Sequence, residues 1–505
     1  MASNGRWSIF DPSCPRPAEM ILAQSKSRIN WFCVSAAIIG AVASAILPLP
    51  SLALIVSVSL CLLLIPVTPL AMLVLLLALA PLRALIATES GIHLPLDIGQ
   101  ILLVLYLGIW LVHGVMKRRP PPGVSREPVL LSAASLCLVF AVGVWTSDAT
   151  GNWLTEWLKW LVIAIMIWHL SQSARFDWRW LVFAVLLSAV ANAVVGLYIF
   201  FGGSGADHLL ILGRFFRAFG TFGQPNPFGG FMGIALPLAL MCAAIQSYQI
   251  MHDLRAGRRV NPARLLLLAA MASAAGIVAA ALFASWSRGA WLGFAVSLVV
   301  MLVALPRRLL MGISLALALA ALFFALWSAG LLPRSVVSRI TTAATDLFSF
   351  SDVRGANFTP TNFAVIERLA HWQAAIGMAQ DHPLFGVGLG SYALRYADYH
   401  LINWEAPLGH AHNQYLNFLA ETGVVGLAAY IAFWISIFRV NWKTLKHPDR
   451  TGRAVAVGLL GCWTYIAVHS VFDNLFVNNL FLHIGVLLAV LAILHRQVAA
   501  SLELD

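Results

Sequence analysis

Long apolar runs, separated by short polar segments, follow one another along most of the chain. A helix that crosses a bilayer needs about 20 mostly apolar residues. The runs predict fourteen spanning helices, near residues 31–47, 51–66, 68–86, 98–116, 128–146, 154–170, 178–201, 227–248, 265–285, 289–305, 309–330, 413–438, 454–472 and 478–495. The first three runs are short and have Pro-rich connections, so a re-entrant hairpin there would leave twelve. The pattern predicts an all-α integral membrane protein with 12–14 transmembrane helices.

The positions of the basic residues test this count of helices. Cytoplasmic loops of membrane proteins carry an excess of Lys and Arg. If the N-terminal tail is cytoplasmic, the basic clusters all fall on the cytoplasmic side: Arg6, Arg16, Lys26, Arg28, residues 117–119, Arg175, Arg179, Arg255, Arg258, Arg259, Arg307, Arg308, the Arg and Lys residues of 439–453, and Arg496. An odd error in the count would place some of them on the other side.

This topology divides the chain into five regions. They are a cytoplasmic tail (1–30), a transmembrane region (31–330) with an outward segment (202–226), an outward loop domain (331–412), C-terminal transmembrane helices (413–495) and a second cytoplasmic tail (496–505). Within the long outward loop, residues 363–380 are expected to form a helix, because Asp381-His382-Pro383 is a typical helix stop.

The composition excludes other classes of protein. Charged residues make up 10% of the chain and hydrophobic residues 60%, whereas a soluble domain carries about 25% charged residues. The net charge of +11 comes from basic loops, and we expect no nucleic-acid partner because no soluble basic domain is present. The six Cys indicate neither a disulfide framework nor a metal-ligand spacing.

The outward segments contain Arg against the topological bias, and no Lys. They hold Arg214, Arg217, Arg288, Arg334, Arg339, Arg354, Arg368 and Arg395. Arg binds phosphate through a planar fork of donors, so an anionic partner outside is expected. For four of them, Arg334, Arg339, Arg354 and Arg395, pairing with Asp346, Asp352, Glu367 and Asp398 is the simpler explanation. Arg217 and Arg288 lie where apolar runs meet polar segments, and their alternative is contact with lipid phosphates.

The long loop ends in a histidine-rich stretch, residues 409–426. His412, at the mouth of a spanning helix, is a candidate base, and His410 is a second. A metal site is not expected, because no third ligand is apparent in the sequence. Glu421 lies deeper on the same helix and needs a partner there.

Two further pairs of titratable residues lie near the outer ends of spanning helices. Glu156 and Lys159 are spaced to pair on one helix face, which favours a structural role over a functional one. His469 and Asp473 are four residues apart on one helix face, so they could pair beside the candidate site or have only a structural role.

Several of these blocks together resemble the O-antigen ligases. The signature of a His, an Asn, nine residues and Gly-x-x-Gly is similar to His412, Asn413, Gly423 and Gly426. Residues 217–230, 287–289 and 382–390 resemble the other blocks, in the same order. The resemblance covers roughly residues 200–480, and the N-terminal runs match only as hydrophobic helices.

The resemblance implies an inverting membrane glycosyltransferase of the C type, without metal, ATP or other cofactor, in the bacterial inner membrane with its active site facing the periplasm. Its donor would be a glycan on undecaprenyl diphosphate and its acceptor a hydroxyl of the lipid A core or of another glycan. His412 would be the general base, and Arg217 and Arg288 would hold the diphosphate. Further contacts to substrates are expected from Arg214, Asn226, Arg368, His410, Asn413, Tyr415, His469 and Asp473.

Three other functions are compatible with the sequence. A polysaccharide polymerase and a protein O-oligosaccharyltransferase would use the same donor, and the Arg and His motifs do not separate them from a ligase. A transporter of lipid-linked glycans is less compatible, because repeat halves are not detectable and the polar residues gather on one face.

Overall fold

A computed structural model describes residues 67–89, 97–117, 123, 126–172, 177–203, 205–333, 335, 337–338, 341, 352–355 and 362–502. The N-terminal tail, the first two expected spans, Arg334, Arg339 and Asp346 lie outside these ranges. The chain forms two compact units, one of residues 1–76 with 100–121 and the other of residues 77–99 with 122–505. All candidate site residues lie in the second unit.

Helices account for nearly all of the described structure. They are α4 (Pro69–Leu79), α5 (Arg83–Glu89), α6 (Ile98–Met116), α7 (Pro128–Val142), α8 (Thr150–Gln172), α9 (Trp178–Gly202), α10 (Pro225–Arg255), α11 (Pro262–Ala284), α12 (Arg288–Ala304), α13 (Leu309–Ser328), α15 (Phe363–Asp381), α16 (Tyr392–Tyr399), α17 (Gln414–Thr444), α18 (Arg450–His469) and α19 (Leu480–Leu502), with short 3₁₀ turns η1 (Ala80–Leu82), η2 (Gly143–Thr146) and η3 (Asp207–Leu209).

Eleven segments of the described chain are long and apolar enough to cross a membrane, and α12 is a shorter apolar helix. Together they account for the twelve spans predicted within the described ranges. This confirms the prediction of an all-α membrane protein. The helix expected at 363–380 is also found, as α15.

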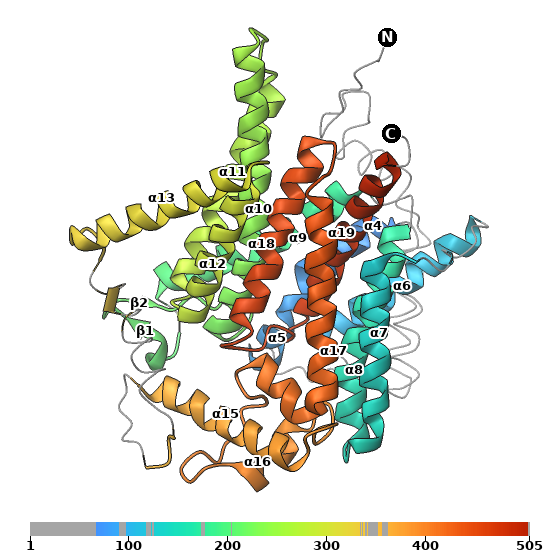
Figure 1. Cartoon of the computed structure of the whole chain (residues 1–505), viewed down its shortest axis with the longest axis vertical. Coiled ribbons are helices and arrows are strands. Elements are labelled where there is room, and N and C mark those ends of the chain that lie inside the picture. The colour runs from blue at the N-terminus through green and yellow to red at the C-terminus, as the bar shows by residue number, and fades with distance from the viewer. Residues whose placement is uncertain are drawn as a thin grey trace, which may run out of the picture. The chain divides into compact units, whose positions relative to one another are not determined.

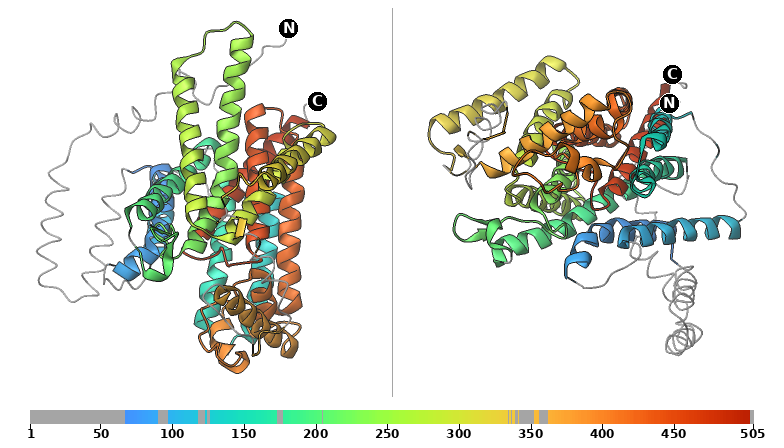
Figure 2. Two further views of the ribbon diagram at one scale, coloured as in Figure 1. Left: turned by 90° about the vertical axis from the view of Figure 1, so that its left-hand side faces the viewer. Right: turned by 90° about the horizontal axis from the view of Figure 1, so that it is seen from below.

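In the second unit, α10 and α18 form the centre of the helix packing. α10 packs against α11, α12 and α18, while α8 packs on α19 and α7 on α17. Glycines permit the closest approaches: Gly233 of α10 lies against the ring of Tyr465 on α18. Figure 1 shows the tip of the α10–α11 hairpin at one end and α15 and α16 at the opposite end. Figure 2 shows α10 and α11 running side by side along this hairpin.

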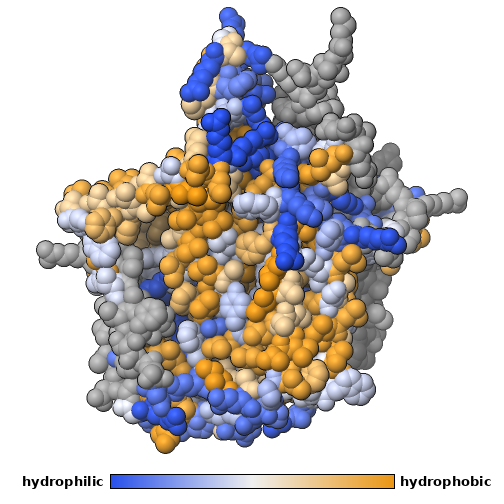
Figure 3. Space-filling model, in the orientation of Figure 1, coloured by the Kyte–Doolittle hydropathy of each residue, from blue (hydrophilic) through white to orange (hydrophobic). Residues whose placement is uncertain are grey.

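The surface of the second unit separates polar from apolar residues. In Figure 3, hydrophilic residues cover the α10–α11 tip and the end with α15 and α16, and the helices between them expose mainly hydrophobic residues. α13, for example, exposes Leu310 (79%) and Phe324 (66%). Large exposed apolar surfaces of this kind are typical of contact with lipid.

The segment between α9 and α10 contains a short hairpin that the sequence did not predict. Strands β1 (Leu210–Ile211) and β2 (Phe215–Phe216) are antiparallel, with Leu210 opposite Phe216. The connecting loop uses positive φ angles at Leu212 (53°) and Gly213 (67°). Strands of two residues give no period-2 pattern, so hydropathy could not reveal them.

A kink in α17 anchors the loop domain to the helical bundle. Gly423 has φ 61° and ψ −166° within the helix, and a Cβ there would collide with the backbone of Leu384. Across the kink, Val387 N–H donates to Ala420 O (2.9 Å) and Val424 N–H donates to Pro383 O (2.9 Å). Glycine is therefore required at 423, because only it accepts both the positive φ and this close approach.

The buried carboxylate of Glu421 acts at the same junction. Its Oε1 accepts a hydrogen bond from the backbone N–H of Tyr392 (3.1 Å). The partner that this carboxylate was expected to need is therefore a backbone amide at the start of α16. Together, Glu421 and the Gly423 kink fix the segment between α15 and α16 against residues 420–424 of α17.

Candidate active site

Arg217 is held by contacts to the ends of two helices. The next residue, Ala218, donates its N–H to Ala284 O at the end of α11 (2.9 Å). The guanidinium Nε of Arg217 donates to Ser285 O (3.0 Å) and Nη2 donates to Asn226 Oδ1 at the start of α10 (3.2 Å). Asn226, predicted as a substrate contact, thus orients Arg217.

Arg288 is the first residue of α12 and follows a strained turn. Trp286 in this turn has φ 54°, a conformation that bulky residues rarely adopt. Ser285 supports the turn, since its hydroxyl donates to Leu282 O (2.6 Å) and accepts from the N–H of Ser287 (3.3 Å). A Cβ at the next residue, Gly289, would lie 2.9 Å from Phe472 Cβ. The start of α12 therefore packs against the segment that carries Asp473.

Arg288 and Arg368 lie close enough to Arg217 for their charges to act on it. Burial, together with the charges of Arg368 and Arg288, lowers the pKa of Arg217 to about 10, so its guanidinium remains charged at neutral pH. The Nη1 of Arg368 donates to Ala364 O (3.3 Å). Within the described ranges, neither Arg217 nor Arg368 forms an ion pair with a carboxylate. Arginines whose charges act on one another in this way are suited to binding a phosphate group.

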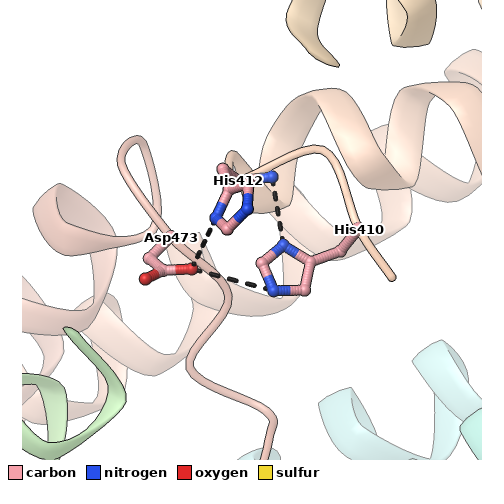
Figure 4. A group of neighbouring side chains, drawn as sticks. All are labelled: His410, His412 and Asp473. Carbon is pink, nitrogen blue, oxygen red and sulfur yellow. Dashed lines mark hydrogen bonds and ion pairs between the residues drawn. The ribbon is translucent and has the colours of Figure 1, made fainter. Parts of the chain in front are cut away.

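His412 forms the centre of a second group of side chains, drawn in Figure 4. Its Nδ1 lies 3.3 Å from Asp473 Oδ1 in the segment after α18. Since Asp473 is a carboxylate, Nδ1 must donate to it, which leaves the lone pair on Nε2 to accept a proton. The backbone of His412 has φ 50°, a left-handed conformation in which His is one of the few enriched non-glycine residues.

The ionisation of Asp473 supports this arrangement. Burial alone would raise the pKa of this carboxyl, but the hydrogen bond from His412 and electrostatic interactions with His412, His410 and Arg368 lower it below its usual value. Asp473 is therefore ionised at neutral pH and holds the His412 ring in one orientation, as the carboxylate does in a His–Asp pair of hydrolases.

His410 lies beside this pair in a different hydrogen-bonding state. Its Nδ1 accepts the backbone N–H of His412 (3.0 Å), so the ring proton must reside on Nε2, which lies 3.8 Å from Asp473 Oδ1. Burial lowers the pKa of His410 to about 4, although Asp473 opposes the shift. His410 is therefore neutral and already uses its lone pair to support the backbone of His412.

His410, His412 and Asp473 also meet a distance criterion for a metal site, since their ligand atoms lie within 4.8 Å of one another. Asp473 is the third group that the sequence did not reveal, because it lies 61 residues beyond His412. A metal ion would need a lone pair on Nε2 of His410. That atom carries the proton as long as Nδ1 accepts from the backbone, so the hydrogen bonding opposes metal coordination.

Other predicted site residues have structural contacts. Asn413 caps α17, its Oδ1 accepting from the N–H groups of Tyr415 (3.0 Å) and Leu416 (3.1 Å), so the helix cap is Asn413 and not a histidine. The Tyr415 hydroxyl donates to Ala467 O (2.8 Å). Arg214 is exposed on the hairpin loop, 5.3 Å over the ring of Phe215.

A side-chain pair of His469 and Asp473 is not found among the contacts of the described residues. α18 ends at His469, so Asp473 lies beyond the helix and its side chain turns to His412 instead. The hydroxyl of Tyr465 donates to Gly229 O (3.0 Å) and receives the Nδ1 proton of His469 (3.2 Å). His469 is therefore a buried link between α18 and α10.

Simple ion pairing is confirmed for several charges. Arg354 pairs with Asp352 (3.0 Å), and Arg395 pairs with Asp148 and with Asp398 (3.6 Å). The expected pair of Glu156 and Lys159 is also found, at 2.6 Å.

Sequence reasoning missed His371 on α15. Its ring lies edge-on to His412 with centroids 5.8 Å apart and stacks on Tyr396 at 4.7 Å. Its Nδ1 is 2.9 Å from the hydroxyl of Tyr392. Burial, helped by electrostatic interactions with His412 and His410, lowers the pKa of His371 to about 4. Its spacing from Arg368 on the helix expected at 363–380 was the signal available in the sequence.

The neutral state of His371 predicts a loss of stability in mild acid. The unfolded chain binds a proton at this residue near pH 6.5, whereas the folded chain does so only near pH 4. Stability is therefore lost as the pH falls from about 6.5 towards 4, by roughly 1–2 kcal/mol at pH 5. We expect a lower melting temperature at pH 5 than at pH 7, and a smaller difference for His371→Gln. An equal pH effect in both proteins would contradict this assignment.

Part of the chain is similar to a known protein family. The model of the O-antigen ligase family matches residues 273–431. This match, over part of the chain, supports a relationship to the O-antigen ligase-like superfamily. Members of the family are glycosyltransferase-like enzymes. No curated protein matches the chain.

The matched O-antigen ligase segment contains much of the candidate site. It includes α12 with Arg288, α15 with Arg368, both loop histidines and the kink at Gly423. Arg217 and Asp473 lie outside the match, and the folded structure brings both to it.

Proposed function

We propose that this protein transfers a glycan from undecaprenyl diphosphate to a hydroxyl of an acceptor such as a lipid A core sugar. The main support for the proposal is that a His–Asp pair and a group of arginines occur in the same site. The first group can accept a proton and the second can bind a diphosphate. The O-antigen ligase family assignment supports the same pairing of functions.

The reaction follows from the positions of these groups. Nε2 of His412 accepts the proton of the acceptor hydroxyl, while that oxygen attacks the anomeric carbon of the donor glycan. The bond from this carbon to the diphosphate oxygen breaks, and undecaprenyl diphosphate leaves with the electron pair. Attack from the face opposite the leaving group inverts the anomeric configuration. The proton on His412 then passes to solvent.

Arg217, Arg288 and Arg368 stabilise the departing diphosphate. Negative charge grows on the bridging oxygen as the bond breaks, and fixed donors in a partly buried site stabilise such charge strongly. Because the donor is already activated, the protein mainly positions the two substrates and offsets this charge. No metal is assigned a role, since the tautomer of His410 opposes its binding.

The same proposal implies a topology for the chain. The loop domain at 331–412, the segment 202–226 and the active site face the periplasm, and the α10–α11 tip lies in the cytoplasm of a bacterial inner membrane. The basic residues Arg255, Arg258 and Arg259 at that tip support this orientation through the positive-inside rule.

Expression in a strain without its own O-antigen ligase tests the function. We expect the chain to restore the ladder of O-antigen-bearing lipopolysaccharide on a gel, because the site would transfer the glycan from undecaprenyl diphosphate to a core sugar. A longer free polysaccharide without a ladder would indicate a polymerase, and glycosylated protein would indicate a protein O-oligosaccharyltransferase. Absence of all three products at normal expression would contradict the proposal.

A further inference from the structure

α15 carries both a cationic and an anionic side chain at the candidate site. Glu367 and His371 are one turn apart and share a helix face, and the His371 ring lies against His412 at 5.8 Å. Arg368, the neighbour of Glu367, belongs to the arginine group. α15 therefore borders the phosphate side of the site with Arg368 and the side of the base with Glu367.

Among the described residues, no contact of Glu367 indicates a structural role for its carboxylate. Its side chain is half-buried, and within the described ranges it takes part in neither an ion pair nor a side-chain hydrogen bond. The nearby acidic residues behave differently: Asp352 binds Arg354, Asp398 binds Arg395, and Asp381 accepts from Tyr399 (2.9 Å). Burial raises the pKa of Glu367, although the charges of His412 and Arg368 oppose the shift.

The chemistry of a carboxylate limits its ligand. Two carboxylate oxygens accept hydrogen bonds but donate none, so Glu367 repels the diphosphate of the donor and attracts groups that donate. Neighbouring hydroxyls on a sugar ring match two carboxylate oxygens, whereas the side chain of a peptide Ser or Thr supplies one hydroxyl.

We propose that Glu367 is the acceptor-binding carboxylate of this site, accepting hydrogen bonds from two neighbouring hydroxyls of a sugar whose third hydroxyl reaches Nε2 of His412. The acceptor is therefore a saccharide and not a protein side chain. This inference rests on the proposed transferase function, because it assigns the acceptor side of the same site.

Steady-state kinetics with purified protein test the assignment. The donor is a defined glycan on undecaprenyl diphosphate, and the acceptors are core-terminated lipopolysaccharide and a Ser-containing peptide. For the saccharide acceptor, Glu367→Gln is expected to raise KM about tenfold, because a neutral amide replaces a charged acceptor and one of its two atoms donates. The Kd for undecaprenyl diphosphate is expected to stay within about twofold. Glu367→Asp, which keeps the charge, is expected to retain more acceptor affinity than Glu367→Gln.

Glu405→Gln is the matched control, since Glu405 is an exposed carboxylate of the same loop domain, and its kinetics are expected to equal those of the wild type. The role of Glu367 is overturned if the wild-type enzyme uses the saccharide and Glu367→Gln either leaves the acceptor KM unchanged or weakens donor and acceptor binding equally. Neither result affects the proposed transferase function. Preferential use of the peptide overturns the saccharide assignment. A wild-type protein that transfers to no acceptor overturns the proposed function, and this inference with it.

Discussion

Replacing His412 with alanine is expected to lower the rate of glycan transfer about a thousandfold, within the range for removal of a positioned general base. Nε2 of His412 is the atom that accepts the proton, because Nδ1 donates to Asp473 at 3.3 Å. The loss should appear in kcat, with donor affinity nearly unchanged, since the diphosphate is bound by arginines. Single-turnover transfer by purified protein measures it.

His410→Ala is the matched control for this substitution. His410 lies beside the same carboxylate, but its lone pair accepts the backbone N–H of His412 at 3.0 Å. Its loss should loosen the loop and reduce the rate by about tenfold, the cost of roughly one hydrogen bond. The reverse order, with His410→Ala more harmful than His412→Ala, would assign the base to His410.

Arg217→Lys is expected to lower kcat about a hundredfold, although it keeps the positive charge. The guanidinium reaches Ser285 O and Asn226 Oδ1 and can present its remaining donor atoms to a diphosphate. A lysine ammonium cannot satisfy these partners and bind phosphate in a bidentate manner. Loss of one fixed donor to a developing anion commonly costs two to three orders of magnitude. The measurement is transfer rate together with the Kd for undecaprenyl diphosphate.

Arg395→Lys provides the comparison for Arg217→Lys. Arg395 lies in the loop domain, where it pairs with Asp148 and Asp398 on the surface. Exposed ion pairs contribute little to stability, so its transfer rate should match that of the wild type. Equal losses in both variants would mean that the arginine effect is general and not a property of the candidate site.

The helices could be predicted from the sequence because each span carries its own apolar signal. The twelve spans within the described ranges and the helix at α15 are local patterns that need no tertiary contact. The outward arginines could also be singled out, because topology makes Arg unexpected there. Of these, Arg354 and Arg395 form surface ion pairs, whereas Arg217 and Arg368 form none with the residues that the structure describes.

The assembly of the site could not be predicted in the same way. Asp473 was assigned to His469 by helical spacing, but α18 ends between them and the carboxylate turns to His412. His371 and Glu367 were missed as site residues because only the docking of α15 brings them to the loop histidines. That docking depends on the kink at Gly423, a long-range contact whose geometry a hydropathy pattern does not encode.

The most direct test of the proposed transferase function is glycan transfer by the purified protein in buffer with a chelator. The donor is a glycan on undecaprenyl diphosphate and the acceptor is core-terminated lipopolysaccharide. We expect the amount of undecaprenyl diphosphate released to equal the amount of glycan on the acceptor, and the anomeric configuration to be inverted. His412→Ala is expected to give almost no release and almost no transfer. Retained configuration, dependence on a divalent metal, or transfer that persists in His412→Ala would contradict it.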